Sequence, residues 1–216
     1  MIKLYQLEKR IINKFLYLFG KHNTFIIYSP QRSFSNFFRQ LLEMNLFINY
    51  EQGKKNLNYY KHNPKVKLDT NLKKNFIIFI LYKEFNLWYE SIKRNPADFF
   101  LKLNKFNINP MTIRDKKKLK KYHKNFYDFW ILNARKTKNI EFVNFREVLN
   151  DENNQFLLSY LKKKYNLMSN SIFKIPTTIR FSKKINKKRI LKSPISKDTQ
   201  FKKINKLIKQ RRDLLI

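Results

Sequence analysis

The chain contains no cysteine and only two glycines, Gly20 and Gly53, among its 216 residues. The absence of cysteine excludes disulfide bonds and thiolate metal sites. The three histidines, His22, His62 and His123, are too scattered to form a recognisable metal-binding motif. We therefore predict that the protein holds no metal ion.

The sequence also lacks a long hydrophobic run, because no uninterrupted apolar stretch approaches the ~20 residues that a membrane-spanning helix needs. Charged residues interrupt the apolar positions of residues 2–19, and no small-residue cleavage site follows them. This pattern predicts an amphipathic N-terminal helix rather than a signal peptide. We expect a cytoplasmic protein without a transmembrane segment.

Acidic residues are scarce, since 15 Asp and Glu stand against 48 Lys and Arg, for a formal net charge of +33. A positive field of this size attracts polyanions such as nucleic acids and acidic glycans. A codon bias toward Lys, Asn, Ile, Phe and Tyr explains the same excess and also the shortage of glycine. The two causes can act together, so the charge by itself does not identify a partner.

Apolar runs alternate with stretches of helical periodicity along most of the chain. Strands are predicted at residues 24–29, 75–81 and 140–145, and helices at 36–47, 86–94, 114–135 and 146–165. Continuously apolar strands separated by helices predict an α/β fold, a three-layer sandwich with a central parallel sheet. We expect one domain over residues 1–172.

Residues 173–216 form a basic C-terminal segment in which Asp198 and Asp213 are the only acids. Residues 201–216 include apolar positions at helical spacing, so we predict that the segment is helical in part. A basic segment of this kind is typically solvated or in non-specific contact with a polyanion such as nucleic acid.

The stretch Thr24–Glu43 combines an apolar strand, a polar turn and an amphipathic helix. Backbone N–H groups and a positive dipole end meet where such a helix begins, which suits a phosphate or sulfate group. Arg32 adds a fork of donors, and Ser33, Ser35 and Asn36 add neutral ones. The same residues also fit an ordinary turn in which Ser and Asn cap the helix.

Lys83 and Ser91 form a second polar pair, at the end of the second predicted strand and on the helix that follows it. Ligands of open α/β sheets bind along the carboxyl edge, where these two side chains could hold a second phosphate. A lysine at a strand end and a serine on a helix are also common surface features.

The order of these segments resembles the superfamily of sulfotransferases that use 3′-phosphoadenosine-5′-phosphosulfate (PAPS). Residues 31–37, QRSFSNF, lie over its first loop, P-[KR]-S-G-[TS]-[TN]-[WFL]. Residues 83–91, KEFNLWYES, match the spacing of its R-[DN]-P-x-[DE]-W-x-x-S signature. Residues 140–151 look like its v-x-f-v-r-Y-E-D-L-L-x-D element, and Tyr60-Lys61-His62 lies where many small bacterial and viral members have W-K-H.

The resemblance implies a P-loop-type architecture and transfer of a sulfuryl group from PAPS to a hydroxyl or amine, releasing 3′-phosphoadenosine-5′-phosphate (PAP). It implies that the 5′-phosphosulfate contacts Arg32, Ser33, Phe34, Ser35 and Asn36. It implies that the 3′-phosphate contacts Lys83 and Ser91, that Arg32 balances charge on the leaving phosphate, and that His62 is the catalytic base. No metal is needed, and the acceptor can be a glycan, a lipid, a small alcohol or a protein tyrosine.

The sequence departs from the resembled motifs at three positions. Phe34 stands in place of the loop glycine, Lys83 in place of an arginine, and Arg146 in place of the acid of Y-E-D. The C-terminal R-K-G-x-x-G-D-W segment is absent. A member of the same fold that has lost its activity is therefore one alternative.

Two further classes fit parts of the sequence. A basic nucleic-acid-binding protein fits the charge and the mixture of aromatic residues with Lys and Arg. A phosphoryl transferase would need a G-x-x-x-x-G-K-[ST] loop, which is absent, and a Mg²⁺-binding carboxylate, for which Glu84 is the one candidate.

Overall fold

The computed structural model describes residues 24–51, 57–94, 112–176 and 198–213, together with Ile11, Pro96 and Phe99. Apart from Ile11, the predicted N-terminal helix over residues 2–19 lies outside the described residues. Among the helices that the structure describes, none has the length and apolar character to cross a membrane.

A four-stranded sheet in the order β2-β1-β3-β4, with every pair of neighbours parallel, forms the centre of the molecule. The strands are β1 (Thr24–Tyr28), β2 (Asn49–Tyr50), β3 (Ile77–Tyr82) and β4 (Ile140–Asn144). The predicted α/β fold with a parallel sheet is confirmed, and all three predicted strands are present. The two-residue strand β2 is an addition, in a stretch without the long apolar run that marks the other three.

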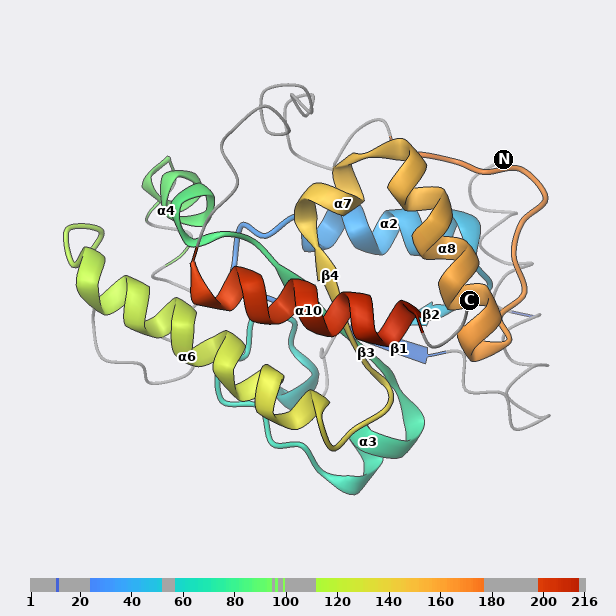
Figure 1. Ribbon diagram of the computed structural model, residues 1–216, viewed down its shortest axis with the longest axis horizontal. Coiled ribbons are helices and arrows are strands. Elements are labelled where there is room, and N and C mark those ends of the chain that lie inside the picture. Colours follow the sequence, from blue (N-terminus) through green and yellow to red (C-terminus); the bar gives the residue numbers. More distant parts are fainter. Residues whose placement is uncertain are drawn as a thin grey trace.

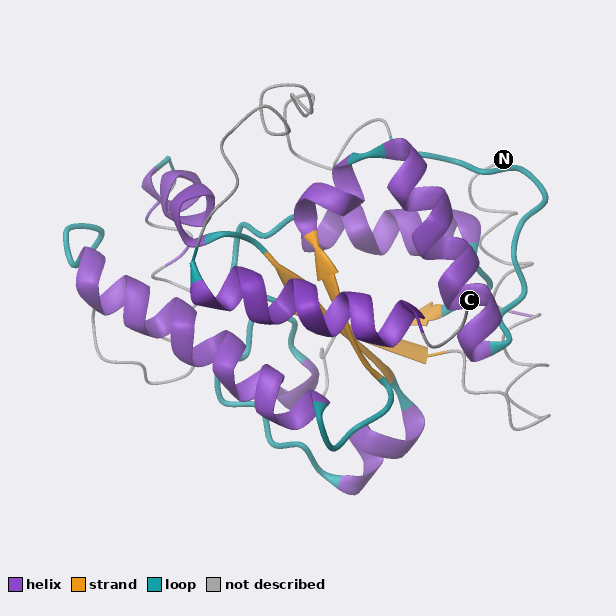
Figure 2. Cartoon of the chain, in the orientation of Figure 1, coloured by secondary structure: helices purple, strands orange, loops and turns teal. Residues whose placement is uncertain are grey.

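Helices lie on both faces of this sheet (Figures 1 and 2). They are α2 (Ser35–Asn45), α3 (Thr70–Asn75), α4 (Phe85–Lys93), α6 (Lys116–Ala134), α7 (Phe145–Leu149), α8 (Asp151–Tyr165) and α10 (Thr199–Asp213), with a 3₁₀ turn at Leu57–Tyr59. The single helix predicted at 146–165 is two helices. The chain breaks at Asn150, whose backbone is extended and whose side chain accepts a hydrogen bond from the N–H of Asn153.

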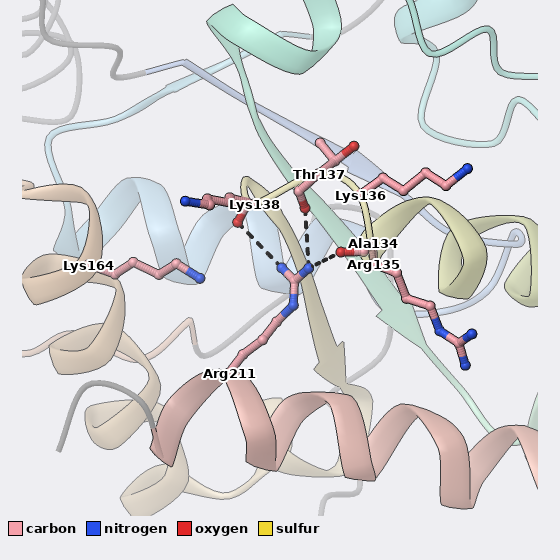
Figure 3. A pocket seen from close by; sticks show the side chains of 7 residues that line it. All are labelled: Ala134, Arg135, Lys136, Thr137, Lys138, Lys164 and Arg211. Atoms are coloured by element: carbon pink, nitrogen blue, oxygen red, sulfur yellow. Dashed lines mark hydrogen bonds between the residues drawn. The ribbon is translucent and has the colours of Figure 1, made fainter.

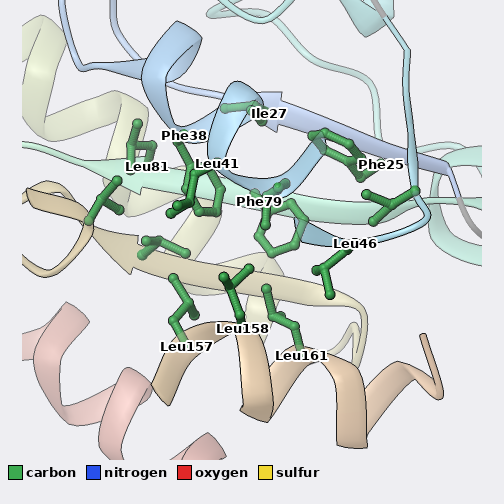
Figure 4. Packing of buried hydrophobic residues seen from close by; sticks show 14 of the residues in the cluster. Phe25, Ile27, Phe38, Leu41, Leu46, Phe79, Leu81, Leu157, Leu158 and Leu161 are labelled. Carbon is green, nitrogen blue, oxygen red and sulfur yellow. The ribbon is translucent and has the colours of Figure 1, made fainter. Parts of the chain in front are cut away.

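Alternate residues of the strands point to opposite faces, and each set belongs to its own apolar cluster. Phe25, Ile27, Phe79 and Leu81 pack with residues of α2, α7 and α8 (Figure 4). The intervening residues Ile26, Tyr28, Ile78, Ile80 and Tyr82 pack with residues of α6 and α10. Burial on both faces explains why the strands are continuously apolar rather than alternating.

The C-terminal helix α10 is part of the second cluster. It packs on β4 and α6, and its Ile204 is fully buried. The phenol of Tyr82 donates to Asp198, whose carboxylate also accepts from the N–H of Phe201 at the start of α10. The basic C-terminal segment therefore contributes a core helix to the described structure.

Replacing Ile204 by alanine should test this packing. Because a buried Ile to Ala change removes apolar contacts and leaves a cavity, we expect the free energy of unfolding to fall by about 2–4 kcal/mol. Chemical denaturation followed by circular dichroism measures it. Lys203→Ala, at the exposed neighbouring position, should change it by less than about 0.5 kcal/mol. Equal stability of the two variants would contradict the packing of α10.

Candidate functional site

The carboxyl ends of β1 and β3 lie side by side, because the two strands pair in parallel from Phe25 opposite Ile77 to Tyr28 opposite Ile80. The chain leaves β1 toward β2 on one side, whereas it leaves β3 toward β4 on the other. Such a reversal in strand order opens a crevice in which ligands of α/β sheets bind. Two segments meet there: residues 29–34, between β1 and α2, and Lys83–Glu84, between β3 and α4.

The loop after β1 has an unusual backbone. Arg32 and Phe34 take left-handed conformations, with φ of 64° and 63°. Such conformations cost a residue with a side chain on the order of 1–2 kcal/mol, and glycine adopts them freely. The position where the resembled motif has glycine is thus left-handed here, although phenylalanine occupies it. The ring of Phe34 stacks on that of Phe145 at 5.9 Å, which helps to hold this conformation.

The first turn of α2 faces this loop without a cap. No side chain of the described residues caps the helix at Phe34, and its first turn contains no acid. The alternative in which Ser or Asn caps α2 is therefore wrong, because Ser35 is already the first helical residue. The positive dipole end of α2 is therefore not offset by a capping side chain or an acid of its own first turn.

Lys83 connects the loop to α4 from a buried position. Its Nζ donates to the hydroxyl of Ser91 at 2.5 Å and to the backbone oxygen of Arg32 at 3.0 Å. The ammonium also lies 5.0 Å from the ring centre of Phe34 and 5.5 Å from that of Phe145. The predicted pair of Lys83 and Ser91 thus meets directly, against the loop that contains Arg32.

Burial, and to a smaller extent the positive charges of Arg94 and Arg32, lower the pKa of Lys83 from 10.5 to about 7. Arg32, Lys83 and Arg94 are therefore close enough to interact electrostatically, and Lys83 contacts the loop that precedes α2. The adjacent acid in the sequence is Glu84. Its carboxylate accepts two hydrogen bonds from Arg146, at 2.5 and 3.1 Å.

The three departures from the resembled motifs lie in contact with one another. Phe34 stacks on Phe145, Lys83 lies over both rings, and the guanidinium of Arg146 lies 5.9 Å from the ring of Phe145. Arg146 is buried with Glu84, and a buried charge needs such a partner. The departures thus form one connected group, which the sequence motifs could not reveal.

His62 is held by hydrogen bonds at Ser29, the first residue of the loop after β1, and its side chain is buried, with 5% of the residue exposed. Its Nδ1 lies 2.9 Å from the backbone oxygen of Ser29, and the N–H of Ser29 donates to the backbone oxygen of Lys61. Because a carbonyl oxygen only accepts, Nδ1 must carry the hydrogen. In the neutral ring Nε2 then has the lone pair, which is the tautomer that a base needs.

The remaining predicted residues have different surroundings. Asn36 is exposed on α2 and accepts a hydrogen bond from Lys61 Nζ at 2.5 Å. Ser35 is buried at the start of α2. The hydroxyl of Ser33 is buried beside the phenol of Tyr127 and makes no well-formed hydrogen bond.

Two residues near the site were not predicted from the sequence. Arg94 follows Ser91 by three positions, so helical spacing places it close enough to act on Lys83. Trp88 matches the resembled motif, and its indole N–H donates to the backbone oxygen of Gln31 at 2.7 Å. This bond joins α4 to the loop after β1. Helical periodicity could have found Arg94, whereas the contact of Trp88 depends on the tertiary fold.

His123 has a structural role. It is buried, donates from Nε2 to the backbone oxygen of Lys83, and has its pKa lowered to about 4, chiefly by burial. Within the described residues, no group of three or more His, Asp or Glu side chains is placed to hold a metal ion. His22 lies outside the described residues.

Comparisons with known proteins identify no relative: no protein-family model, no curated protein and no solved structure matches this chain. The geometry of the site is therefore the basis for any functional conclusion.

The buried charge of Lys83 should make stability depend on pH. Between pH values of about 7 and 10.5 the unfolded chain binds more protons at this residue than the folded protein, so stability rises with pH there. At pH 7 and below, the full cost of the buried charge is present. Lys83→Met removes that cost, so its stability relative to the wild type should be highest near pH 6 and fall by about 2–4 kcal/mol toward pH 10.

Denaturant titrations of both proteins across this pH range measure the difference. Lys93→Met, at an exposed position on the same helix, is the matched control and should show no such trend. A difference between Lys83→Met and the wild type that does not vary with pH would mean that Lys83 keeps its ordinary pKa in the folded protein.

Proposed function

We propose that this protein is a PAPS-dependent sulfotransferase. The observation that carries the proposal is the buried ammonium of Lys83, which contacts Ser91 and the loop before α2 and is affected by the charges of Arg32 and Arg94. Among the described residues, no carboxylate is hydrogen-bonded to this ammonium, and no side chain caps the nearby N-terminal end of α2. The cations repel one another and also repel the positive dipole end of α2. A bound anion would relieve both repulsions. The site therefore suits a ligand with more than one phosphate or sulfate group.

The placement of the side chains supports two anion subsites. The N–H groups of α2 and the guanidinium of Arg32 offer donors to the 5′-phosphosulfate. Lys83 and Ser91 offer an ammonium and a hydroxyl, already in contact, to the 3′-phosphate. A 3′-phosphate distinguishes PAPS from ordinary adenine nucleotides, so this second subsite would select the donor.

The proposed reaction needs one base and one group that stabilises the leaving phosphate. The acceptor oxygen bonds to sulfur, the bond from sulfur to the 5′-phosphate oxygen breaks, and the acceptor proton passes to Nε2 of His62. PAP leaves with the additional negative charge, which Arg32 and the N-terminal end of α2 stabilise. The ring of His62 is held for this role by its bond to Ser29. A glycan, a lipid, a small alcohol or a protein tyrosine each supplies a suitable hydroxyl.

Calorimetric titration with PAP, and with 5′-AMP for comparison, tests the donor site. We expect PAP to bind about 10- to 100-fold more tightly, because the 3′-phosphate gains charge-assisted hydrogen bonds from Lys83 and Ser91. Ser91→Ala should weaken PAP binding about 3- to 10-fold and leave 5′-AMP binding unchanged. Ser159→Ala, an exposed serine on α8, is the matched control.

Proton uptake provides an independent readout of the same contact. A phosphate beside Lys83 raises its pKa, so PAP binding near pH 8 should take up a proton, and binding near pH 6 should not. Titrations in buffers of different ionisation enthalpy measure this uptake. Equal affinity for PAP and 5′-AMP, without proton uptake, would remove the 3′-phosphate subsite and with it the proposed donor.

His62→Asn tests the base, because asparagine keeps an N–H near the position of Nδ1 but lacks Nε2. We expect turnover with PAPS to fall about 100-fold or more while PAP affinity stays within about twofold of the wild type. Release of PAP in the presence of candidate acceptors measures turnover. Undiminished turnover would exclude His62 as the base. PAP binding by the wild type without turnover on any acceptor class would instead favour a donor-binding protein that has lost its activity.

A further inference from the structure

Two cavities with basic linings lie at the amino edge of the sheet, opposite the candidate site. The first, of about 440 Å³, is lined at the end of α6 and by residues of α8 and α10 (Figure 3). The second, of about 420 Å³, lies at the end of α8. Six of their lining residues form what we name the basic rim: Arg135, Lys136, Lys138, Lys162, Lys163 and Lys164.

A seventh cation, Arg211 of α10, already has a structural task. Its guanidinium donates to the backbone oxygens of Ala134, Thr137 and Lys138, at the end of α6 (Figure 3). The carbonyl of Ala134 is one of those that a helix leaves unsatisfied where it ends, and Thr137 and Lys138 belong to the turn that follows α6. Arg211 therefore caps α6, and this cap uses none of the side chains of the basic rim.

One residue of the rim, Lys164, forms a salt bridge with a carboxylate, that of Glu141. None of the described residues that line the two cavities is Asp or Glu. The nearest carboxylate, Glu141, is buried and accepts hydrogen bonds from Lys164 and Tyr160. Arg135, Lys136 and Lys138 are exposed next to one another, and in Figure 3 the side chains of the first two point away from Arg211. Their mutual repulsion is a cost that an external polyanion removes.

We propose that the basic rim binds the phosphodiester backbone of a nucleic acid. Lysine predominates, and it binds phosphate as a compact point charge without the paired geometry that arginine uses. The cations are spread over the ends of two helices, which suits a chain of singly charged groups better than one small ligand. No aromatic side chain lines either cavity, so bases have no stacking partner there and binding is independent of sequence.

The proposal does not depend on the sulfotransferase proposal, because the two sites share no residue. The rim residues Arg135, Lys136 and Lys138, in the turn after α6, precede β4, whereas the candidate site follows β1 and β3. In a parallel sheet these are opposite edges. The positive dipole end of α2 is likewise absent from the rim, where helices end.

Fluorescence anisotropy of the full chain with a labelled single-stranded DNA of mixed sequence tests the proposal. The test variant is the triple substitution Lys136→Gln, Lys138→Gln and Lys162→Gln. Near 100 mM salt it should bind about 10- to 100-fold more weakly than the wild type, and its salt slope should be about 2 smaller in magnitude, since three phosphate contacts are lost. Lys162 lies in the last turn of α8, where a cation is favourable, so the free energy of unfolding of the variant should stay within about 1 kcal/mol of that of the wild type.

The matched control removes three exposed lysines from the N-terminal half of α6, away from the rim, by Lys117→Gln, Lys120→Gln and Lys121→Gln. Its net charge equals that of the test variant, so it should bind within about threefold of the wild type. Equal weakening of both variants would show that net charge alone drives binding and would overturn the proposal. Competition by heparin at matched charge that is stronger than competition by unlabelled DNA would also overturn it, in favour of an acidic glycan.

Discussion

The parallel pairing of β1 with β3 is the constraint on which the other elements depend. Four residues of each strand are in register, from Phe25 opposite Ile77 to Tyr28 opposite Ile80. Both faces of the paired strands are apolar, so helices must cover each face. The parallel pairing also directs the two loops that follow the strands to one edge of the sheet. The place of the candidate site follows from this topology. After β1 the chain continues to one side of the sheet and after β3 to the other, so a crevice opens between their carboxyl ends.

At the carboxyl edge, polar and aromatic contacts replace the small residues that usually permit such a loop. Phe34 takes a left-handed conformation, and its ring gains a stacking partner in Phe145. Lys83 gains a hydroxyl, a carbonyl oxygen and two aromatic faces, but no carboxylate from the part of the chain that the structure describes. Lys83 is thus buried and its pKa is lowered to about 7, an arrangement that is common where proteins bind anions or tune a pKa.

The two edges of the sheet differ in the direction of their helix dipoles. At the amino edge, helices end and cations are electrostatically favourable, and Arg211 shows this directly by capping α6. At the carboxyl edge α2 begins, and the cations beside it are electrostatically unfavourable without a ligand. A cation that is unfavourable without a ligand is stronger evidence of a binding site than one that a helix end stabilises. Each cation at the carboxyl edge is therefore a better indicator of function than each of the more numerous cations at the amino edge.

The sequence by itself determined the α/β class, because continuous apolar runs and helical periodicity depend only on local pattern and on burial of both sheet faces. It also paired Lys83 with Ser91, since strand end and helix position follow from spacing. Only the tertiary structure decided that Glu84 pairs with Arg146, that Trp88 holds the loop after β1, and that Asn150 divides the last predicted helix of the domain. The first two contacts join residues far apart in the chain, and the third feature is a local break in the backbone. Residue spacing along the sequence predicts neither kind of feature.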